Sequence, residues 1–93
     1  MRIKVKALSA LEKVTGGSLV LELEGGNTAK NLIEKLDSLF GEDFQKHTGE
    51  KLLDAINRYN MIVNKKTLRF PKDLDYEFKD HDSVILLHVT GGG

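Results

Sequence analysis

The sequence contains no cysteine at any of its 93 positions. A chain without thiols cannot form a disulfide, a thiolate metal site or a cysteine nucleophile. If this protein handles sulfur, the sulfur is therefore not carried on a side-chain thiol.

The sequence also lacks an excess of either charge. Its 14 basic and 14 acidic residues are spread along the chain, and the formal net charge is zero. Proteins that bind nucleic acids usually show a basic stripe or patch. None is visible here, so the sequence argues against a nucleic-acid partner.

Long apolar runs are missing as well. None approaches the roughly 18 residues that a membrane-spanning helix needs. Residues 1–6 alternate between apolar and charged side chains, unlike the apolar core of a secretory signal peptide. We therefore expect a cytoplasmic protein with no membrane partner.

The short chain leaves little room for an enclosed active site. Its length predicts a single domain, and 40% hydrophobic residues are enough for one modest core. A domain of this size buries only about 60–65% of the surface of its unfolded chain. Most of the protein is therefore expected to be scaffold.

Alternating apolar and polar side chains predict strands. Residues 2–8 and 18–24 alternate with the period of two that is typical of half-buried strands. A loop over 9–17 that ends in two glycines predicts that they form an antiparallel hairpin. Residues 84–89 are almost continuously apolar, which predicts a mid-sheet strand buried on both faces. Two shorter strands are expected before it, at 60–64 and 68–70.

One amphipathic helix is predicted over about residues 28–40. Its apolar side chains share one stripe and are expected to face the core: Ala29, Leu32, Ile33, Leu36, Leu39 and Phe40. Asn27 or Thr28 can cap its first turn. Gly41 is expected to end the helix, because glycine adopts the left-handed conformation easily. A loop over 42–51 and a short second helix over 52–59 would follow.

The order of elements is strand, strand, helix, strand, short strand, strand. If the first and last strands pair in parallel at the centre, the main helix covers one face of a mixed sheet of four to five strands. This arrangement is an α+β β-grasp. We expect residues 1–90 to form this domain and residues 91–93 to form a flexible tail.

The tail is the strongest candidate for chemistry. Gly91, Gly92 and Gly93 follow directly on a predicted core strand, and glycine has no Cβ, so the tail is thin and free in its backbone angles. Such a tail suits threading a terminal carboxylate into a narrow channel of another protein, where an acyl adenylate would be open to a sulfur or amine nucleophile. We predict Gly93 as the reactive group, with Gly92 and Gly91 needed for its activation.

Other candidate sites are weaker. His47, His81 and His88 have no metal-ligand spacing, and we predict no metal site. Asp80 and Asp82 lie in a predicted turn, where carboxylates commonly accept hydrogen bonds from nearby backbone N–H groups. No residue is predicted to be a catalytic group of the protein itself.

Two residues just before the tail are candidates for partner docking. The main helix covers one face of the predicted sheet, and the other face, if apolar, would be a docking surface. Leu87 and Val89 are the candidates on it. The alternative, that both are ordinary sheet residues, stays open.

The end of the chain, Asp80-His81-Asp82-Ser83-Val84 through Gly92-Gly93, resembles the ubiquitin-like sulfur carriers. These include the MoaD-like small subunit of molybdopterin synthase, the thiamine sulfur carrier and the small archaeal modifier proteins. Asp82 and Val84 match the family's turn aspartate and first strand valine, and Gly92-Gly93 match its terminal pair. Val63-Asn64 also resembles a Val-Asn turn of the family.

The chain departs from the family pattern in three places. His81 stands where the family often has glycine, His88-Val89 replaces Pro-Pro, and Thr90 replaces valine. The segment before the glycines is therefore less apolar than in typical molybdopterin synthase subunits. These departures shift the expected role toward protein modification, or a dual role.

The resemblance implies a carrier or modifier and not an enzyme. An E1-like adenylating enzyme would use ATP to form a Gly93 adenylate, which becomes a thiocarboxylate or an isopeptide bond to lysines of target proteins. The large subunit of molybdopterin synthase is a further implied partner, and no cofactor would be stably bound. Two alternatives stay open: a sulfur carrier for molybdopterin synthase only, and a ubiquitin-like binding module with an inert tail.

Overall fold

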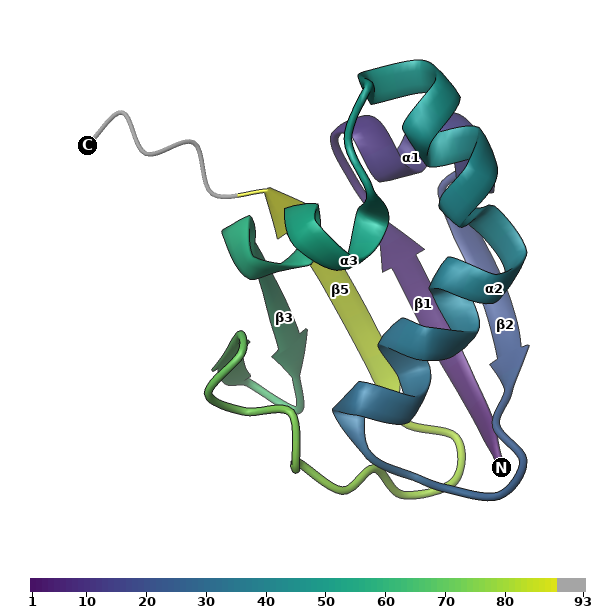
Figure 1. The fold of residues 1–93 in the computed structure, drawn as a ribbon. Coiled ribbons are helices and arrows are strands. Elements are labelled where there is room, and N and C mark those ends of the chain that lie inside the picture. The colour runs from purple at the N-terminus through teal and green to yellow at the C-terminus, as the bar shows by residue number, and fades with distance from the viewer. Residues whose placement is uncertain (89–93) are drawn as a thin grey trace.

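A five-stranded mixed sheet forms the frame of residues 1–88, which are the residues that the structure, a computed structural model, describes. Its strands are β1 (Arg2–Ala7), β2 (Ser18–Glu22), β3 (Tyr59–Val63), β4 (Lys66–Arg69) and β5 (Ser83–His88). The order across the sheet is β2-β1-β5-β3-β4 (Figure 1). β1 and β5 pair in parallel at the centre, and the other neighbours are antiparallel. The predicted β-grasp is confirmed.

The helix α2 (Ala29–Thr48) crosses one face of this sheet (Figure 1). Its buried side chains meet the inward side chains of the strands in a single hydrophobic core. The most deeply buried residues from helix and sheet include Ile3, Val5, Leu21, Leu32, Leu36, Met61, Val84 and Leu86. Within residues 1–88, none of the helices combines the length and apolar character of a membrane span.

Thr28 caps the start of α2, as predicted. Its side-chain oxygen accepts a hydrogen bond from the Asn31 backbone N–H at 3.3 Å, and the Asn31 side-chain oxygen accepts one from the Thr28 N–H at 3.0 Å. This reciprocal capping box satisfies two N–H groups that the helix itself leaves without a partner. It places the helix start firmly at Ala29.

The predicted end of the helix at Gly41 is wrong, and so is the loop over 42–51. The helix continues to Thr48 and ends at Gly49, whose φ of 78° is left-handed and whose N–H bonds to the Gln45 carbonyl oxygen. Gly41 and Phe44 are both buried within the helix, so tertiary packing extends it past a residue that disfavours helix. Leu39, predicted to face the core, is instead 50% exposed.

The predicted loop over 9–17 is also wrong, because it contains the helix α1 (Ala10–Thr15). Leu11 is completely buried and anchors this helix to the core, and Gly16 ends it with a φ of 85°. Six residues are too few to display a helical period in the sequence. The short helix over 52–59 is confirmed as α3 (Leu52–Ala55) followed by the single turn η1 (Ile56–Arg58).

The last strand, β5, lies mid-sheet as predicted, but it is not buried on both faces. Val84 and Leu86 point into the core and are buried, whereas Ile85 between them is 36% exposed. In residues 1–88 no second layer covers that face. The continuous apolar run therefore reflects a strand with one buried face and one apolar face that stays open.

The predicted turn before β5 is held by its two aspartates. Asp80 accepts a hydrogen bond from the Arg2 backbone N–H at 2.8 Å, and Asp82 accepts one from the Lys79 N–H at 2.8 Å. His81 between them has a left-handed φ of 68°, a conformation that costs histidine less than most residues. The predicted local hydrogen bond within the turn is confirmed for Asp82. Asp80 instead bonds to a residue distant in sequence and so ties the start of β5 to the start of β1.

Replacing Leu11 with alanine tests whether α1 belongs to the core. We expect Leu11→Ala to lower the free energy of unfolding by about 2–5 kcal/mol, because it empties a fully buried site. Leu39→Ala is the matched control and should change it by less than about 0.5 kcal/mol, since Leu39 is half exposed. Urea unfolding of both variants gives the answer, and equal small effects would mean that residues 9–17 are an unpacked loop.

The Asp80 turn predicts a specific loss of stability in acid. The Arg2 N–H holds the pKa of the Asp80 carboxyl below its ordinary value, and the charge of His81 adds to this. A lowered pKa in the folded state means that stability is present above the ordinary pKa and is lost as the pH falls below about 4. Asp80→Asn should therefore show a flatter pH dependence of unfolding below pH 4 than the unchanged chain. Identical profiles in urea titrations from neutral to acid pH would contradict this.

Candidate functional site

The predicted reactive tail begins where the structure's description ends. Gly91, Gly92 and Gly93, together with the docking candidate Val89, lie outside residues 1–88. His88 is the last residue of β5. It lies at the end of the sheet where β1 also ends and β3 begins. The chain therefore reaches its terminal segment from the central strand of the sheet.

The ring of His88 packs against Tyr59 at this end of the sheet. The two ring centroids are 5.3 Å apart and the ring planes meet at 81°, an edge-to-face contact. Such contacts contribute about 0.5–1.5 kcal/mol beyond the area that they bury. Tyr59 is itself buried, and this burial raises the pKa of its hydroxyl. His88 is thus held against the core at the residue that precedes the segment leading to Gly93.

An ion pair borders the same end of the sheet. Arg58, at the end of η1, donates a hydrogen bond to the carboxylate of Glu50. This bond lowers the pKa of Glu50 and raises that of Arg58, and the charge of His88 also lowers the pKa of Glu50. Both side chains are exposed to solvent, so the pair supplies local polarity more than stability. Sequence reasoning missed it because the two residues come from different turns.

The three histidines do not come together. His47 lies near the end of α2, His81 lies in the turn before β5, and His88 is the last residue of β5. Within residues 1–88, no group of three His, Asp or Glu side chains is arranged to hold a metal ion. The described part of the chain therefore offers no candidate metal centre.

The sheet face opposite α2 carries the apolar surface suggested by the sequence. Strand pairing places Ile62 beside Ile85 and Asn60 beside Leu87 on this face, which we call the open face. Leu87, predicted as a docking residue, lies half-buried on it. The neighbouring strand β1 adds Lys4 and Lys6, with Lys6 next to Ile85. The open face is thus an apolar strip with a basic border.

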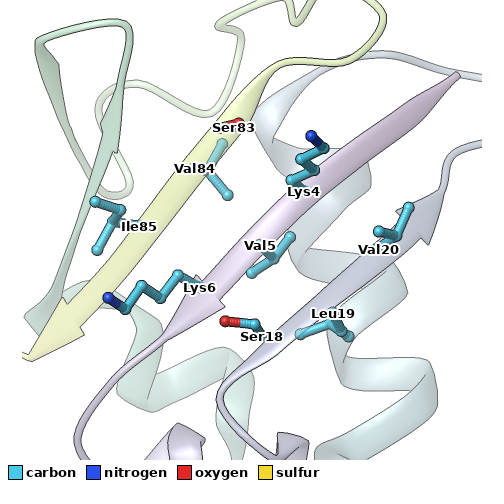
Figure 2. Close-up of a pocket in the computed structure, with 9 residues that line it drawn as sticks. All are labelled: Lys4, Val5, Lys6, Ser18, Leu19, Val20, Ser83, Val84 and Ile85. Carbon is cyan, nitrogen blue, oxygen red and sulfur yellow. The ribbon is translucent and has the colours of Figure 1, made fainter.

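A shallow depression of about 430 Å³ lies on this side of the sheet, across β2, β1 and β5. Figure 2 shows the Lys4 and Lys6 side chains on β1 between Val20 of β2 and Ile85 of β5. The depression is open and mostly apolar, and it holds no acid–base pair. Its chemistry suits contact with a protein surface better than catalysis.

Solved structures of similar fold extend over almost the whole chain. SAMP1 from Haloferax volcanii has 16% identity and a TM-score of 0.68, with all of both chains covered. A putative molybdopterin converting factor subunit 1 from Pyrococcus furiosus has 22% identity and a TM-score of 0.68, covering 95% of this chain and 97% of the other. The Amycolatopsis orientalis BexX/CysO complex matches with 26% identity and a TM-score of 0.62, covering 98% of this chain and 99% of the matched one.

No curated protein sequence matches the chain. A sequence model described as the ThiS family, however, matches residues 5–93, which include the second half of β1, all of β5 and the terminal glycines. The match spans nearly the full sequence and agrees with the fold of the three structures above. These structures share the ubiquitin-like β-grasp fold with this chain, and the family match shows that the chain belongs to the ThiS family.

Proposed function

We propose that this protein is a ubiquitin-like modifier, sulfur carrier, or both, whose Gly93 carboxylate is activated by an E1-like adenylating enzyme. The observation that carries the proposal is the family match through residue 93, on a chain whose central strand leads into Gly91-Gly92-Gly93. The absence of cysteine supports it, because the sulfur of a carrier would then sit on the C-terminus. The protein would be the substrate of the activating enzyme and not itself an enzyme.

The proposed chemistry has two steps. In the first, a Gly93 carboxylate oxygen attacks the α-phosphorus of ATP, and pyrophosphate leaves. In the second, a nucleophile attacks the acyl carbon of the adenylate, and AMP leaves. Hydrosulfide as the nucleophile gives a thiocarboxylate, and the amine of a target-protein lysine gives an isopeptide bond. Neither step needs a side chain of this protein as acid or base.

The folded domain would serve as the handle for the tail. Ordering three residues in a narrow channel costs about 1–2 kcal/mol each in backbone entropy. Contacts of the open face offset that cost, because Ile62, Ile85 and Leu87 present apolar side chains beside the charged Lys4 and Lys6. The activating enzyme is therefore expected to dock on this face with an apolar, acid-bordered surface.

A second partner is favoured by the comparisons. One structural neighbour is named as a molybdopterin converting factor subunit, and another is part of a complex with the protein BexX. By analogy, the large subunit of molybdopterin synthase is a candidate to receive sulfur from Gly93. The departures at His88 to Thr90 favour target-protein lysines as the alternative acceptor.

Intact mass spectrometry tests the chemistry at Gly93. The chain is incubated with ATP, a sulfide source and the activating enzyme of the same host. We expect the mass gain of one sulfur-for-oxygen exchange. A chain lacking Gly92 and Gly93 should keep its mass and should also form no conjugates on a blot. An intact chain that stays unchanged under all conditions would support the inert binding module instead. A truncated chain that still forms conjugates would contradict reaction at Gly93.

A charge placed on the open face tests the docking role. Ile85→Asp should raise the KM for this protein in the activation reaction about tenfold or more, because it removes an apolar contact and places a carboxylate in the partner's surface. The matched control is Leu53→Asp, since Leu53 is similarly exposed, at 47%, but lies on α3 and away from the open face. Equal effects of the two substitutions on KM would show that the activating enzyme does not dock on the open face.

A further inference from the structure

The two edges of the sheet differ in how they resist pairing with another strand. An unprotected edge strand offers free backbone groups to another chain, and natural proteins block it with charged residues or proline. The edge strand β4 (Lys66–Arg69) has a cation at each end, and Pro71 follows shortly after it. The edge strand β2 (Ser18–Glu22) is apolar at its three central positions and has one charge, Glu22. The β2 edge is therefore the less protected one.

The free backbone groups of β2 can be assigned from its pairing with β1. The Ala7 N–H bonds to the Gly17 carbonyl oxygen, and the Leu23 N–H bonds to the Met1 carbonyl oxygen. Bonded and non-bonded pairs alternate along an antiparallel ladder, so Leu19 and Leu21 also bond toward β1. The N–H and carbonyl groups of Ser18, Val20 and Glu22 then point outward, away from the sheet.

The centre of this outward row is also apolar and exposed. Val20 is 59% exposed, more than any other large hydrophobic residue described in the structure. It lies next to Lys4 on the open side of the sheet, and Ser18 lies next to Lys6 (Figure 2). The β2 edge thus presents Ser18, Val20 and Glu22 as alternating small, apolar and acidic side chains on one face.

We propose that β2 pairs with the β2 strand of a second copy of this chain to form a weak, reversible homodimer. In an antiparallel arrangement centred on Val20, the two Val20 residues face each other. Ser18 of each copy then faces Glu22 of the other. The outward groups of all three residues find partners, which gives about six backbone hydrogen bonds. The two sheets join into one continuous sheet.

The charges on β1 and β2 complement each other in this register. Within one copy, Lys6 of β1 pairs with Ser18 of β2. In the dimer that Ser18 faces Glu22 of the second copy, so Lys6 and this Glu22 are two strand spacings apart. With strands about 4.8 Å apart, Lys6 and that Glu22 are about 10 Å apart at their Cα atoms, within reach of two long side chains. Lys6 makes no ion pair within residues 1–88, whereas the Glu22 carboxylate lies 3.4 Å from both the Arg2 guanidinium and the N-terminal ammonium of Met1. In the dimer, Lys6 of the other copy would add a third cation near each Glu22.

Repulsion in this arrangement is small. The nearest like charges of the two copies, which are the two Lys4 residues and Arg2 with Lys6 of the other copy, are each three strand spacings, or about 14 Å, apart. This distance exceeds the screening length of about 8 Å at physiological salt. The net charge of zero also removes the overall repulsion between copies. Since only one short edge is covered, the interface is of the small, transient class.

The dimer leaves the proposed chemistry accessible. β1 lies between β2 and β5, so the strand that leads toward Gly93 is not part of the new interface. Most of the open face, from Ile85 to Ile62, also stays uncovered. Of the residues assigned to the two surfaces, self-association and activation by another enzyme therefore share Lys6, which borders both, and the first does not depend on the second.

Sedimentation velocity from micromolar to millimolar protein concentration tests the proposal. We expect the sedimentation coefficient of the unchanged chain to rise with concentration. Val20→Lys should abolish the rise, because it places two cations opposite each other at the centre of the pairing. The matched control Thr67→Lys adds the same charge at the β4 edge and should behave like the unchanged chain. Circular dichroism confirms that both variants are folded.

A charge exchange tests the register. Lys6→Glu and Glu22→Lys should each weaken the dimer several-fold, and the double variant should recover most of the loss. An unchanged chain that stays monomeric at millimolar concentration overturns the proposal. So does a Val20→Lys variant that still dimerises, or a Thr67→Lys variant that loses dimerisation equally. A double variant weaker than both single ones overturns the proposed register.

Discussion

The parallel pairing of β1 with β5 is the constraint on which the rest of the structure depends. These strands come from opposite ends of the described chain, and their register joins Val5 to Val84 and Ala7 to Leu86. The bond from the Arg2 N–H to Asp80 and the turn at His81 hold the start of β5 beside the start of β1. Once this pair is central, β2 and β3 add on either side, and α2 covers the face where the inward side chains converge. The end of β5 is thereby held in a fixed position between the end of β1 and the start of β3.

A single helix layer leaves the two faces of the sheet unlike each other. One face is closed by α2 and holds a core with no buried polar or charged side chain among the described residues. The other keeps Ile62, Ile85 and Leu87 near solvent, bordered by lysines of β1. A 93-residue chain could not easily enclose an active site as well. The closed face therefore provides the stability of the domain, and the open face is the surface left for recognition by the proposed partner.

The sequence predicted the strands, the start of α2 and the turn before β5, because each has a local cause. The capping oxygen of Thr28 and the period-2 pattern of β1 act within a few residues. The prediction of secondary structure from sequence was wrong where tertiary packing overrides the local preference of the residues. Gly41 stays helical because Phe44 is buried beyond it, and Leu11 makes a helix of a segment too short to show a period. The Tyr59–His88 contact depends on the register of β3 with β5, which no single-sequence pattern reveals. The terminal glycines were found from sequence alone, and the structure does not describe them.

The central claim is that the Gly93 carboxylate is the group that an activating enzyme adenylates. The most direct measurement is the exchange of labelled pyrophosphate into ATP, catalysed by that enzyme in the presence of this protein. We expect exchange with the unmodified chain and none with an otherwise identical chain whose C-terminus is an amide. Equal exchange with both chains, or none with the unmodified chain and a fully active enzyme, would contradict it.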